Sequence, residues 1–390
     1  MRIAFSGFFL HASHTGTGRY IYNLLDALGR QDQVSEYHIL SAEPIRERPD
    51  TPANMRWETV QGNKTNLGGQ GPQQLLWEQV TFPRAARRLQ ADMIHVPYFA
   101  APLRAYNIPV VVTILDMIPQ RLPVYRGRMF TKAHFRVVER AARHASAIIA
   151  ISQHCKQDIV DVLGIDPDRI SVTYLAADTR FRPVEYDRQQ ELRLRLGLPG
   201  PFVLNVGGMD ARKNLAALVE AFARVYAQLG NADLRLFIAG NPARLGTDPI
   251  MPDWRPLASR LGIAEKIICA PVEEADLATL YSATDCFAFT SLYEGFALTP
   301  LEAMACGAPV VCSNRTSVPE VVGEAALIVD PLDTEALSGN ILRVLTSPET
   351  AQQLRAQGLA RARTFTWERT AAETQAIYSL AARGQARPVS

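Results

Sequence analysis

Short apolar segments alternate with amphipathic segments along this chain of 390 residues, and no other feature of the sequence limits the fold as strongly. A short, wholly apolar segment is typical of a strand that is buried on both faces. Such strands belong to parallel sheets, in which a helix carries the chain back to the start of the next strand. The sequence therefore predicts an α/β fold with helices on both faces of its sheets.

The alternation occurs twice, which predicts two doubly wound domains. A polar, proline-containing segment at 178–200 interrupts it, so we place the domains at 1–180 and 181–365. Ligands of such folds bind at the carboxyl ends of strands, here expected in a cleft between the domains. Strands are expected at 3–5, 37–40, 56–60, 92–96, 110–114, 147–151, 170–174, 202–206, 234–239, 267–269, 286–290, 310–312 and 326–329, and the clearest helices at 19–28, 73–89, 128–145 and 215–229.

The composition excludes several classes of protein. The 41 basic and 39 acidic residues give a formal net charge of +2, too small an excess for a dedicated nucleic-acid binder. No run of about 18 apolar residues occurs, which argues against a membrane span. The five cysteines lack metal-ligand spacing and lie mostly in apolar segments, as expected for reduced core residues of a cytoplasmic protein.

The charge is distributed unevenly along the chain. Residues 1–180 carry a net charge of +5 and residues 181–390 a net charge of −3. A basic segment at 121–143 accounts for much of this excess, and one interpretation is a solvated helix face. The other is attraction to an anionic acceptor or to lipid headgroups, with peripheral contact to a membrane. Its cations are Arg121, Arg126, Arg128, Lys132, Arg136, Arg140 and Arg143, against one acid, Glu139.

A first glycine motif, Gly16-Thr17-Gly18, follows the first expected strand. Glycines at this place let backbone amides of a helix N-terminus approach a phosphate or a sugar. The third glycine of a dinucleotide-binding motif is absent, because position 21 is Ile21. The motif alone fits a plain turn as well as a ligand-binding loop.

A second motif combines two glycines with two adjacent cations. Gly207 and Gly208 follow an apolar strand, and Arg212 and Lys213 precede a helix that begins near Asn214. Amides at a helix N-terminus together with two cations suit a diphosphate. We expect both cations at the rim of the cleft, and the alternative is a surface pair without function.

A third motif carries two glutamates, Glu294 in a loop and Glu302 in a short helix. Thr299 and Pro300 have the residue types of an N-cap and a first helical position, which would make Glu302 part of a capping box. The other interpretation is that both carboxylates face the cleft and accept hydrogen bonds from vicinal hydroxyls of a sugar or a ribose.

These motifs resemble glycosyltransferase family 4. The resemblance covers nearly the whole chain and is densest from 202 to 370. It rests on the run Glu-Gly-Phe-Ala-Leu-Thr-Pro-Leu-Glu-Ala-Met-Ala-Cys-Gly-Ala-Pro that begins at Glu294, on Gly207-Gly208 with Arg212-Lys213-Asn214, and on shorter matches at 16–20, 317–323 and 365–368.

The resemblance implies a GT-B fold, in which two Rossmann-like domains face each other across a cleft and the last segment, 366–390, crosses back to the first. It implies transfer of a hexose from a nucleotide diphosphate sugar, with retention at the anomeric carbon and with no metal and no cofactor. The acceptor would be a hydroxyl of a glycan, a polysaccharide precursor or a lipid-linked sugar. Similarity to bacterial mannosyltransferases favours GDP-mannose over a UDP-sugar.

The resemblance also implies roles for single residues. Arg212 and Lys213 would bind the diphosphate, and Gly208 belongs to the same phosphate-binding segment. Glu294 would bind hydroxyls of the donor sugar, and Glu302 the ribose. Phe296, Ala297, Leu298 and Thr299 would offer backbone amides, and Gly16 and Gly18 would let the first domain close on the donor.

Two positions depart from the family pattern. Many relatives have a His-Asp pair whose histidine contacts the donor sugar, but this chain has Leu115-Asp116, and its first strand ends in Ser6 rather than Asp. Leu115 cannot donate a hydrogen bond, so either another group contacts the sugar or the contact is dispensed with. Asp116 is the candidate catalytic neighbour in the first domain. With no firmly placed nucleophile, front-side displacement fits best, in which the leaving diphosphate takes the acceptor's proton.

Two alternatives from other classes stay open at this point. One is a nucleotide-binding oxidoreductase with two doubly wound domains, against which the missing third glycine counts. The other is a catalytically inactive protein that binds nucleotide sugars. The retained Arg212, Lys213, Glu294 and Glu302 argue against such decay.

Overall fold

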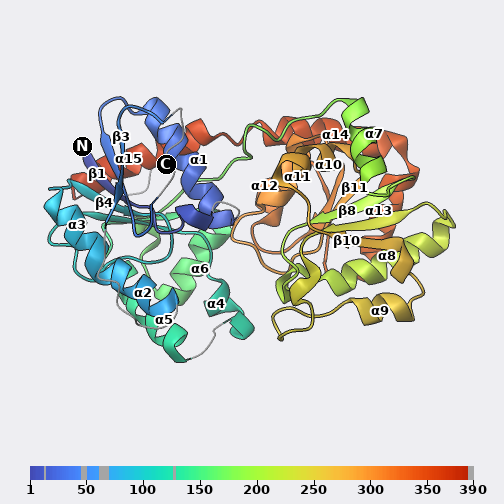
Figure 1. The fold of residues 1–390 in the computed structure, drawn as a ribbon, viewed down its shortest axis with the longest axis horizontal. Helices are drawn as coiled ribbons and strands as arrows, with labels where there is room; N and C mark the ends of the chain where they lie inside the picture. Colours follow the sequence, from blue (N-terminus) through green and yellow to red (C-terminus); the bar gives the residue numbers. More distant parts are fainter. Residues whose placement is uncertain (13–14, 45–50, 61–69, 126–128, 385–390) are drawn as a thin grey trace. The chain divides into compact units, whose positions relative to one another are not determined.

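The computed structural model describes residues 1–12, 15–44, 51–60, 70–125 and 129–384. The chain divides into two units, which are described separately here (Figure 1). Unit 1 comprises Met1–Leu175 and Thr366–Ser390, and unit 2 comprises Ala176–Phe365. The sequence placed the corresponding boundaries after residues 180 and 365.

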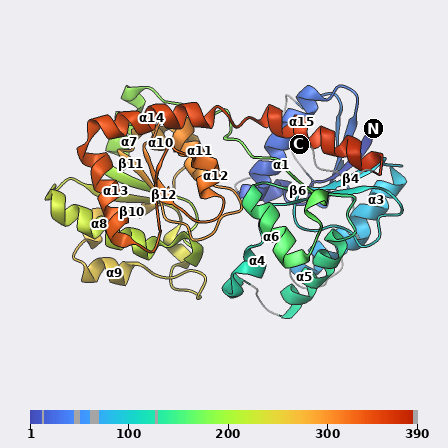
Figure 2. The same ribbon diagram turned by 180° about the vertical axis from the view of Figure 1, so that it is seen from behind.

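Unit 1 is built on a parallel sheet with the strand order β3-β2-β1-β4-β5-β6-β7. Helices α1 and α15 pack together over one face, and α3, α5 and α6 cover the other (Figures 1 and 2). The strands are β1 (Arg2–Ser6), β2 (Glu36–Ser41), β3 (Met55–Thr59), β4 (Met93–Val96), β5 (Val110–Ile114), β6 (Ala147–Ala150) and β7 (Ile170–Val172). The helices are α1 (Gly16–Gln31), α2 (Gln70–Leu76), α3 (Phe82–Arg88), α4 (Ile118–Arg121), α5 (Met129–Ala142), α6 (Gln153–Leu163) and α15 (Trp367–Ala382).

Unit 2 has a second parallel sheet, with the strand order β10-β9-β8-β11-β12-β13. Helices α8, α9 and α13 lie over one face, and α7, α10, α11 and α14 over the other (Figure 1). The strands are β8 (Phe202–Val206), β9 (Arg235–Ala239), β10 (Ile267–Ala270), β11 (Cys286–Phe289), β12 (Val310–Ser313) and β13 (Leu327–Val329). The helices are α7 (Tyr186–Arg195), α8 (Leu215–Leu229), α9 (Arg255–Arg260), α10 (Leu277–Ala283), α11 (Leu298–Ala305), α12 (Val318–Val322), α13 (Thr334–Thr346) and α14 (Pro348–Ala362).

The strands lie where the apolar segments predicted them, because most are buried on both faces. All residues of β5 and of β8 are buried, for example. The polar segment 178–200 differs from the expected interruption, since it contains α7, which packs on α10. One residue of α7, Leu192, is buried, so the helix leaves almost no apolar periodicity in the sequence.

A buried polar chain fastens α15 to the sheet of unit 1. His95 of β4 lies 2.6 Å from the Tyr378 hydroxyl through Nδ1 and 2.9 Å from Thr113 Oγ1 through Nε2. Thr113 of β5 also lies 3.0 Å from the Tyr20 hydroxyl of α1. Burial lowers the pKa of His95 to about 3, so the ring is neutral at physiological pH. One ring nitrogen then donates and the other accepts, which joins four elements without burying a charge.

We expect Tyr378→Phe to lower the free energy of unfolding by about 1–3 kcal/mol, because it leaves the buried Nδ1 of His95 without its partner. Urea denaturation followed by circular dichroism measures the change. Tyr186→Phe is the matched control, since Tyr186 of α7 is 68% exposed. Equal stability of the two variants would show that the hydrogen bond to His95 does not hold α15 in place.

Candidate active site

Two loops leave the same edge of the unit 2 sheet. Strands β8 and β11 are parallel neighbours, so the loops that follow them, at 207–214 and 290–297, start side by side. From β8 the chain continues to β9 on one side, whereas from β11 it continues to β12 on the other. This is the switch point of the strand order, where open α/β sheets bind their ligands.

The loop after β8 opens with a conformation that requires glycine. Gly207 has φ +140°, and a Cβ atom there would lie 3.7 Å from both Cε and Nζ of Lys213. The chain then forms a 3₁₀ turn over Ala211–Lys213 and enters α8 through Asn214, whose φ is +52°. The Asn214 side chain holds this turn by donating to the Pro331 carbonyl at 2.7 Å. The turn presents Arg212 and Lys213 to the loop that follows β11.

Arg212 and Lys213 both contact the carboxylate of Glu294. Nη1 of Arg212 lies 2.8 Å from Oε2, and Nζ of Lys213 lies 2.5 Å from Oε1. Asp210 completes the group, because its Oδ1 lies 3.0 Å from Nε of Arg212. We call these four residues the charge cluster. Two cations and two carboxylates thus balance each other at the switch point.

The charge cluster is buried rather than placed at a rim. The side chains of Lys213, Glu294 and Arg212 are 10%, 12% and 18% exposed. Burial alone would raise the pKa of Glu294, but the charges of Lys213 and Arg212 hold that pKa below its ordinary value. Glu294 is therefore ionised at neutral pH.

The rim position expected for both cations is wrong for Lys213. Its ammonium lies 5.0 Å from the centre of the Phe289 ring, and its backbone carbonyl accepts from Thr290 Oγ1 at 2.8 Å. These contacts draw Lys213 against the end of β11. The local sequence gives no sign of them, because the partners lie more than 70 positions further along the chain.

Two residues that sequence reasoning missed fix the backbone of Glu294. The amide of Glu294 donates to Thr316 Oγ1 at 3.0 Å, and its carbonyl accepts from Ser317 Oγ at 3.0 Å. Both residues follow β12, the next strand of the sheet. A third loop therefore positions the carboxylate, and the match at 317–323 was the signal that pointed to it.

The capping box expected around Glu302 is wrong. Helix α11 begins at Leu298 with Ala297 as its N-cap, so Thr299 is already the second helical residue and makes no cap hydrogen bond. Burial of Phe296 and Ala297 brings the chain into the helix early. Glu302 is buried as well, and its Oε2 accepts from the Tyr281 hydroxyl at 3.2 Å.

The remaining donor-side positions of unit 2 lie in the same loops. Leu298 and Thr299 are partly exposed in the first turn of α11, where amides lack intrahelical carbonyl partners. The Leu298 amide donates to the Phe296 carbonyl at 2.9 Å. At Gly208 a Cβ atom would come within 3.0 Å of Asp210 Oδ2, so this glycine lets the loop pass close to the charge cluster.

Unit 1 carries the other predicted residues. Gly16 and Gly18 form the first turn of α1, and the Gly18 amide donates to the N-cap Thr15 at 3.1 Å. Leu115 and Asp116 follow β5, and Asp116 Oδ1 accepts from the Ile118 amide at 3.0 Å. That contact gives Asp116 a role in starting α4.

Ser6, where relatives often have Asp, supports aromatic side chains at the end of β1. Its Oγ lies 3.1 Å from the Tyr98 hydroxyl and accepts from Trp77 Nε1 at 3.2 Å. Trp77 opens a π-helical turn over Trp77–Thr81, which divides the helix expected at 73–89. A carboxylate in place of this hydroxyl would add a buried charge beside the two aromatic rings.

The two ends of the basic segment have structural roles. Arg121 contacts Asp158 and Asp161 at 2.6 Å each, and Arg143 Nε donates to the Leu163 carbonyl at 2.9 Å. These contacts tie α4 and the end of α5 to α6. Arg126, Arg128 and the side chain of Lys132 lie outside the described residues.

Three further properties of the described residues bear on metal ions, membranes and disulfides. Within the described ranges there is no group of three or more His, Cys, Asp or Glu side chains that could hold a metal ion. Among the helices that the structure describes, none is both long enough and apolar enough to cross a membrane. All five cysteines are thiols rather than halves of disulfides, and four of them are buried.

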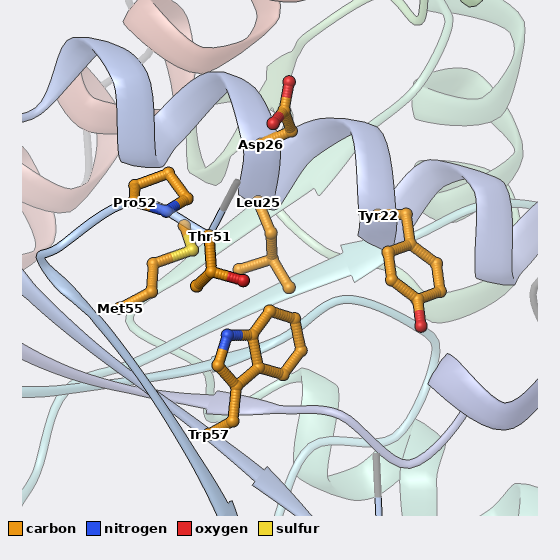
Figure 3. Close-up of a pocket in the computed structure, with 7 residues that line it drawn as sticks. All are labelled: Tyr22, Leu25, Asp26, Thr51, Pro52, Met55 and Trp57. Carbon is orange, nitrogen blue, oxygen red and sulfur yellow. The ribbon is translucent and has the colours of Figure 1, made fainter. Parts of the chain in front are cut away.

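Figure 3 shows a hollow in unit 1 between α1 and β3, which holds none of the predicted site residues. Its lining is mainly apolar, because Asp26 pairs with Arg30 at 3.0 Å and points away from the Trp57 ring. The lining residues are Tyr22, Leu25, Asp26, Thr51, Pro52, Met55 and Trp57.

Comparison with known proteins identifies the family. Residues 189–361 match the model of Glycosyl transferases group 1, and residues 14–181 match that of Glycosyltransferase Family 4. O-antigen chain mannosyltransferase B of Escherichia coli is 30% identical, with 94% of this chain and 96% of that protein covered. The chain belongs to the group 1, family 4 glycosyltransferases. This membership overturns the oxidoreductase alternative, and the protein is a glycosyltransferase.

Further relatives and solved structures agree. Serotype-specific mannosyltransferase WbdA of Escherichia coli is 31% identical over 71% of this chain and 34% of its own length. Sucrose-phosphate synthase from Thermosynechococcus elongatus superposes with a TM-score of 0.75 at 21% identity, covering 97% of this chain and 98% of that one. Anabaena HepE in complex with UDP and glucose gives 0.72 at 18% identity, with 97% and 99% covered. These structures confirm the GT-B fold.

We expect Lys213→Met to lower the free energy of unfolding by about 3 kcal/mol, because one oxygen of the buried Glu294 carboxylate then faces an apolar chain. Chemical denaturation measures the loss. Lys266→Met is the control, since the Lys266 ammonium donates to the exposed Ala232 carbonyl and should contribute less than about 1 kcal/mol. The double variant Lys213→Met/Glu294→Gln should recover part of the loss. Failure to recover any would mean that the uncompensated charge is not its cause.

Proposed function

We propose that this enzyme is a retaining mannosyltransferase that moves mannose from GDP-mannose to a hydroxyl of a glycan, a polysaccharide precursor or a lipid-linked sugar. The observation that carries the choice of sugar is the similarity to O-antigen chain mannosyltransferase B, which extends over nearly the full length of both proteins. The competing donor is a UDP-sugar, since the related fold of HepE binds UDP and glucose. We also propose peripheral contact with a membrane through cations of unit 1.

The charge cluster supports binding of the donor diphosphate. Charges interact more strongly in a buried site than in water, and a preorganised pair of cations stabilises a leaving group without rearrangement. Arg212 is the more exposed of the two cations, so we assign it direct contact with the diphosphate. Lys213 is more deeply buried and would stabilise the diphosphate through its charge, without direct contact.

Glu294 has two tasks in this proposal. A carboxylate accepts about four hydrogen bonds, so Glu294 can accept a hydroxyl of the donor sugar while it holds both cations. Glu302 would accept from the ribose, next to its contact with Tyr281. The first-turn amides at 296–299 would complete the part of the donor site that unit 2 supplies. Gly16 and Gly18 of unit 1 stay proposed donor-binding residues on the strength of the family resemblance alone.

The proposed reaction is a front-side displacement. The bond between the anomeric carbon and the diphosphate oxygen breaks, and the bond to the acceptor oxygen forms on the same face of the sugar. The proton of the acceptor hydroxyl passes to the leaving diphosphate. The enzyme positions both substrates and stabilises the leaving charge through Arg212 and Lys213. Asp116 is the proposed catalytic neighbour from unit 1.

Arg212→Gln is expected to weaken binding of GDP by about 1.5–3 kcal/mol, the value of a hydrogen bond to a charged group. Isothermal titration calorimetry of GDP measures this loss. The same titration with UDP tests whether the enzyme prefers a guanine or a uracil nucleotide. Arg188→Gln removes an exposed arginine of α7 and serves as the control with the same change in charge. Unchanged affinity for GDP in the Arg212 variant would show that the diphosphate does not bind at the charge cluster. Preference for UDP would replace GDP-mannose with a UDP-sugar.

We expect transfer of mannose to continue in excess EDTA, because the two cations take the place of a metal at the diphosphate. Initial rates with and without the chelator measure this, and the coupling constants of the newly formed product, observed by NMR, report its anomeric configuration. Strict dependence on Mg²⁺ or Mn²⁺ would contradict the metal-free proposal. Inversion of the anomer would contradict front-side displacement, and absence of any turnover would favour the inactive sugar-nucleotide-binding alternative.

A further inference from the structure

Unit 1 carries a second group of cations, which the donor site does not use. They lie on α3, on the loop 101–109 between β4 and β5, and on the second half of α5 and the residues after it. All of them are exposed. We call this surface the basic face, and its cations are Arg84, Arg87, Arg88, Arg104, Arg136 and Arg140, with His144 at its border.

The arginines of the basic face have no acidic partners among the residues that the structure describes. Several exposed arginines elsewhere in unit 1 are paired with carboxylates, for example Arg30 with Asp26 and Arg121 with Asp161. Six like charges without acidic partners repel one another. A negatively charged partner would relieve this repulsion, so the clustering of these arginines on one surface favours an anionic partner.

The loop 101–109 places an aromatic ring, that of Tyr106, and the apolar side chain of Leu103 among these cations. Two guanidinium groups contact the Tyr106 ring, with Arg87 at 4.8 Å and Arg104 at 5.0 Å from its centre. Tyr106 and Asn107 have φ values of +54° and +64°, a costly backbone conformation for residues other than glycine. Leu103 is 51% exposed, and its amide is fixed by Gln79 Oε1 at 2.9 Å. The loop is thus held with an apolar side chain directed to solvent.

Two open hollows are each lined in part by this loop. Arg84, Arg87, Arg88 and Tyr106 line one of them, and Leu103, Val137 and the α5 cations line the other. Leu103 and Tyr106 are three positions apart, so both hollows share the same short loop. Guanidinium groups bind phosphate in bidentate geometry. The surface therefore offers arginine-lined places for phosphates around an apolar tip.

We propose that the basic face docks unit 1 on the surface of an anionic phospholipid bilayer. A bilayer presents many phosphates in one plane together with apolar chains just beneath them, which matches cations spread over three elements around an exposed leucine. The inference rests on the proposed function and deepens its peripheral contact. It keeps Arg136 and Arg140 of the segment 121–143 and adds α3 and loop 101–109. Its test uses neither donor nor acceptor, so the two proposals fail separately.

Each arginine near an anionic membrane strengthens binding about fivefold, the equivalent of about 1 kcal/mol. Replacing three of them should therefore weaken binding roughly a hundredfold. Because the attraction is electrostatic, binding should also fall steeply as salt is raised from 0.1 M to 0.5 M, since the Debye length shrinks well below about 10 Å. Both effects distinguish this docking from insertion by apolar contacts alone.

Co-sedimentation of the full chain with vesicles tests the proposal. The vesicles contain either phosphatidylcholine alone or phosphatidylcholine with about a third phosphatidylglycerol. The test variant is Arg84→Gln/Arg87→Gln/Arg136→Gln, and the matched control is Arg188→Gln/Arg260→Gln/Arg343→Gln, which removes three exposed arginines of unit 2. A Leu103→Ser variant tests the apolar tip without changing the charge.

We expect the wild type and the control to bind the anionic vesicles, the basic-face variant to lose roughly a hundredfold, and Leu103→Ser to lose severalfold. None should bind pure phosphatidylcholine. Absence of wild-type binding, or equal losses in the two triple variants, would overturn the proposal. So would binding of an acidic protein or of RNA by the basic face in place of vesicles. Circular dichroism and chemical denaturation of each variant show that it is folded.

Discussion

The ion pairs that Glu294 makes with Arg212 and Lys213 determine how the unit 2 site is built. Parallel strands bring the loops after β8 and β11 to one edge, but this places only their backbones. The buried carboxylate joins the two loops, and its own backbone is held from a third loop by Thr316 and Ser317. Because a buried charge is costly without its partner, the three loops cannot move independently. A fixed arrangement of charges of this kind is what the proposed stabilisation of a leaving diphosphate requires.

The two cations of this cluster differ in burial, and their proposed roles differ accordingly. Lys213 lies against Phe289 and next to Gly207, where its positive charge stabilises the buried carboxylate of Glu294. Arg212 is nearer to solvent and is oriented by Asp210 and Glu294 on two of its nitrogens. A planar guanidinium held in this way recognises a phosphate with little further loss of side-chain entropy. In the proposed function, the same pairs that stabilise the loop would also orient Arg212 for the diphosphate.

Local sequence patterns predicted the features that depend on local burial. The strands of both sheets were predictable because segments such as 110–114 are apolar throughout, which reflects burial on both faces. Helix α7 was not, since a single buried residue leaves no periodicity. The residue types around Thr299 fit a capping box, yet tertiary packing of Phe296 and Ala297 starts α11 earlier. The burial of Lys213 depends on residues of a distant strand, which no local pattern contains.

Local sequence patterns also fail to show which arginines lie together on the folded surface. In the sequence the basic residues from 121 to 143 form one group, because only their spacing along the chain is visible. In the folded unit Arg121 and Arg143 are used to hold α6, whereas Arg136 and Arg140 belong to a surface with α3 and loop 101–109. What separates the two sets is the presence of an acidic or carbonyl partner within reach. An arginine with such a partner contributes to the fold, and a group of arginines without one remains available to an anionic surface.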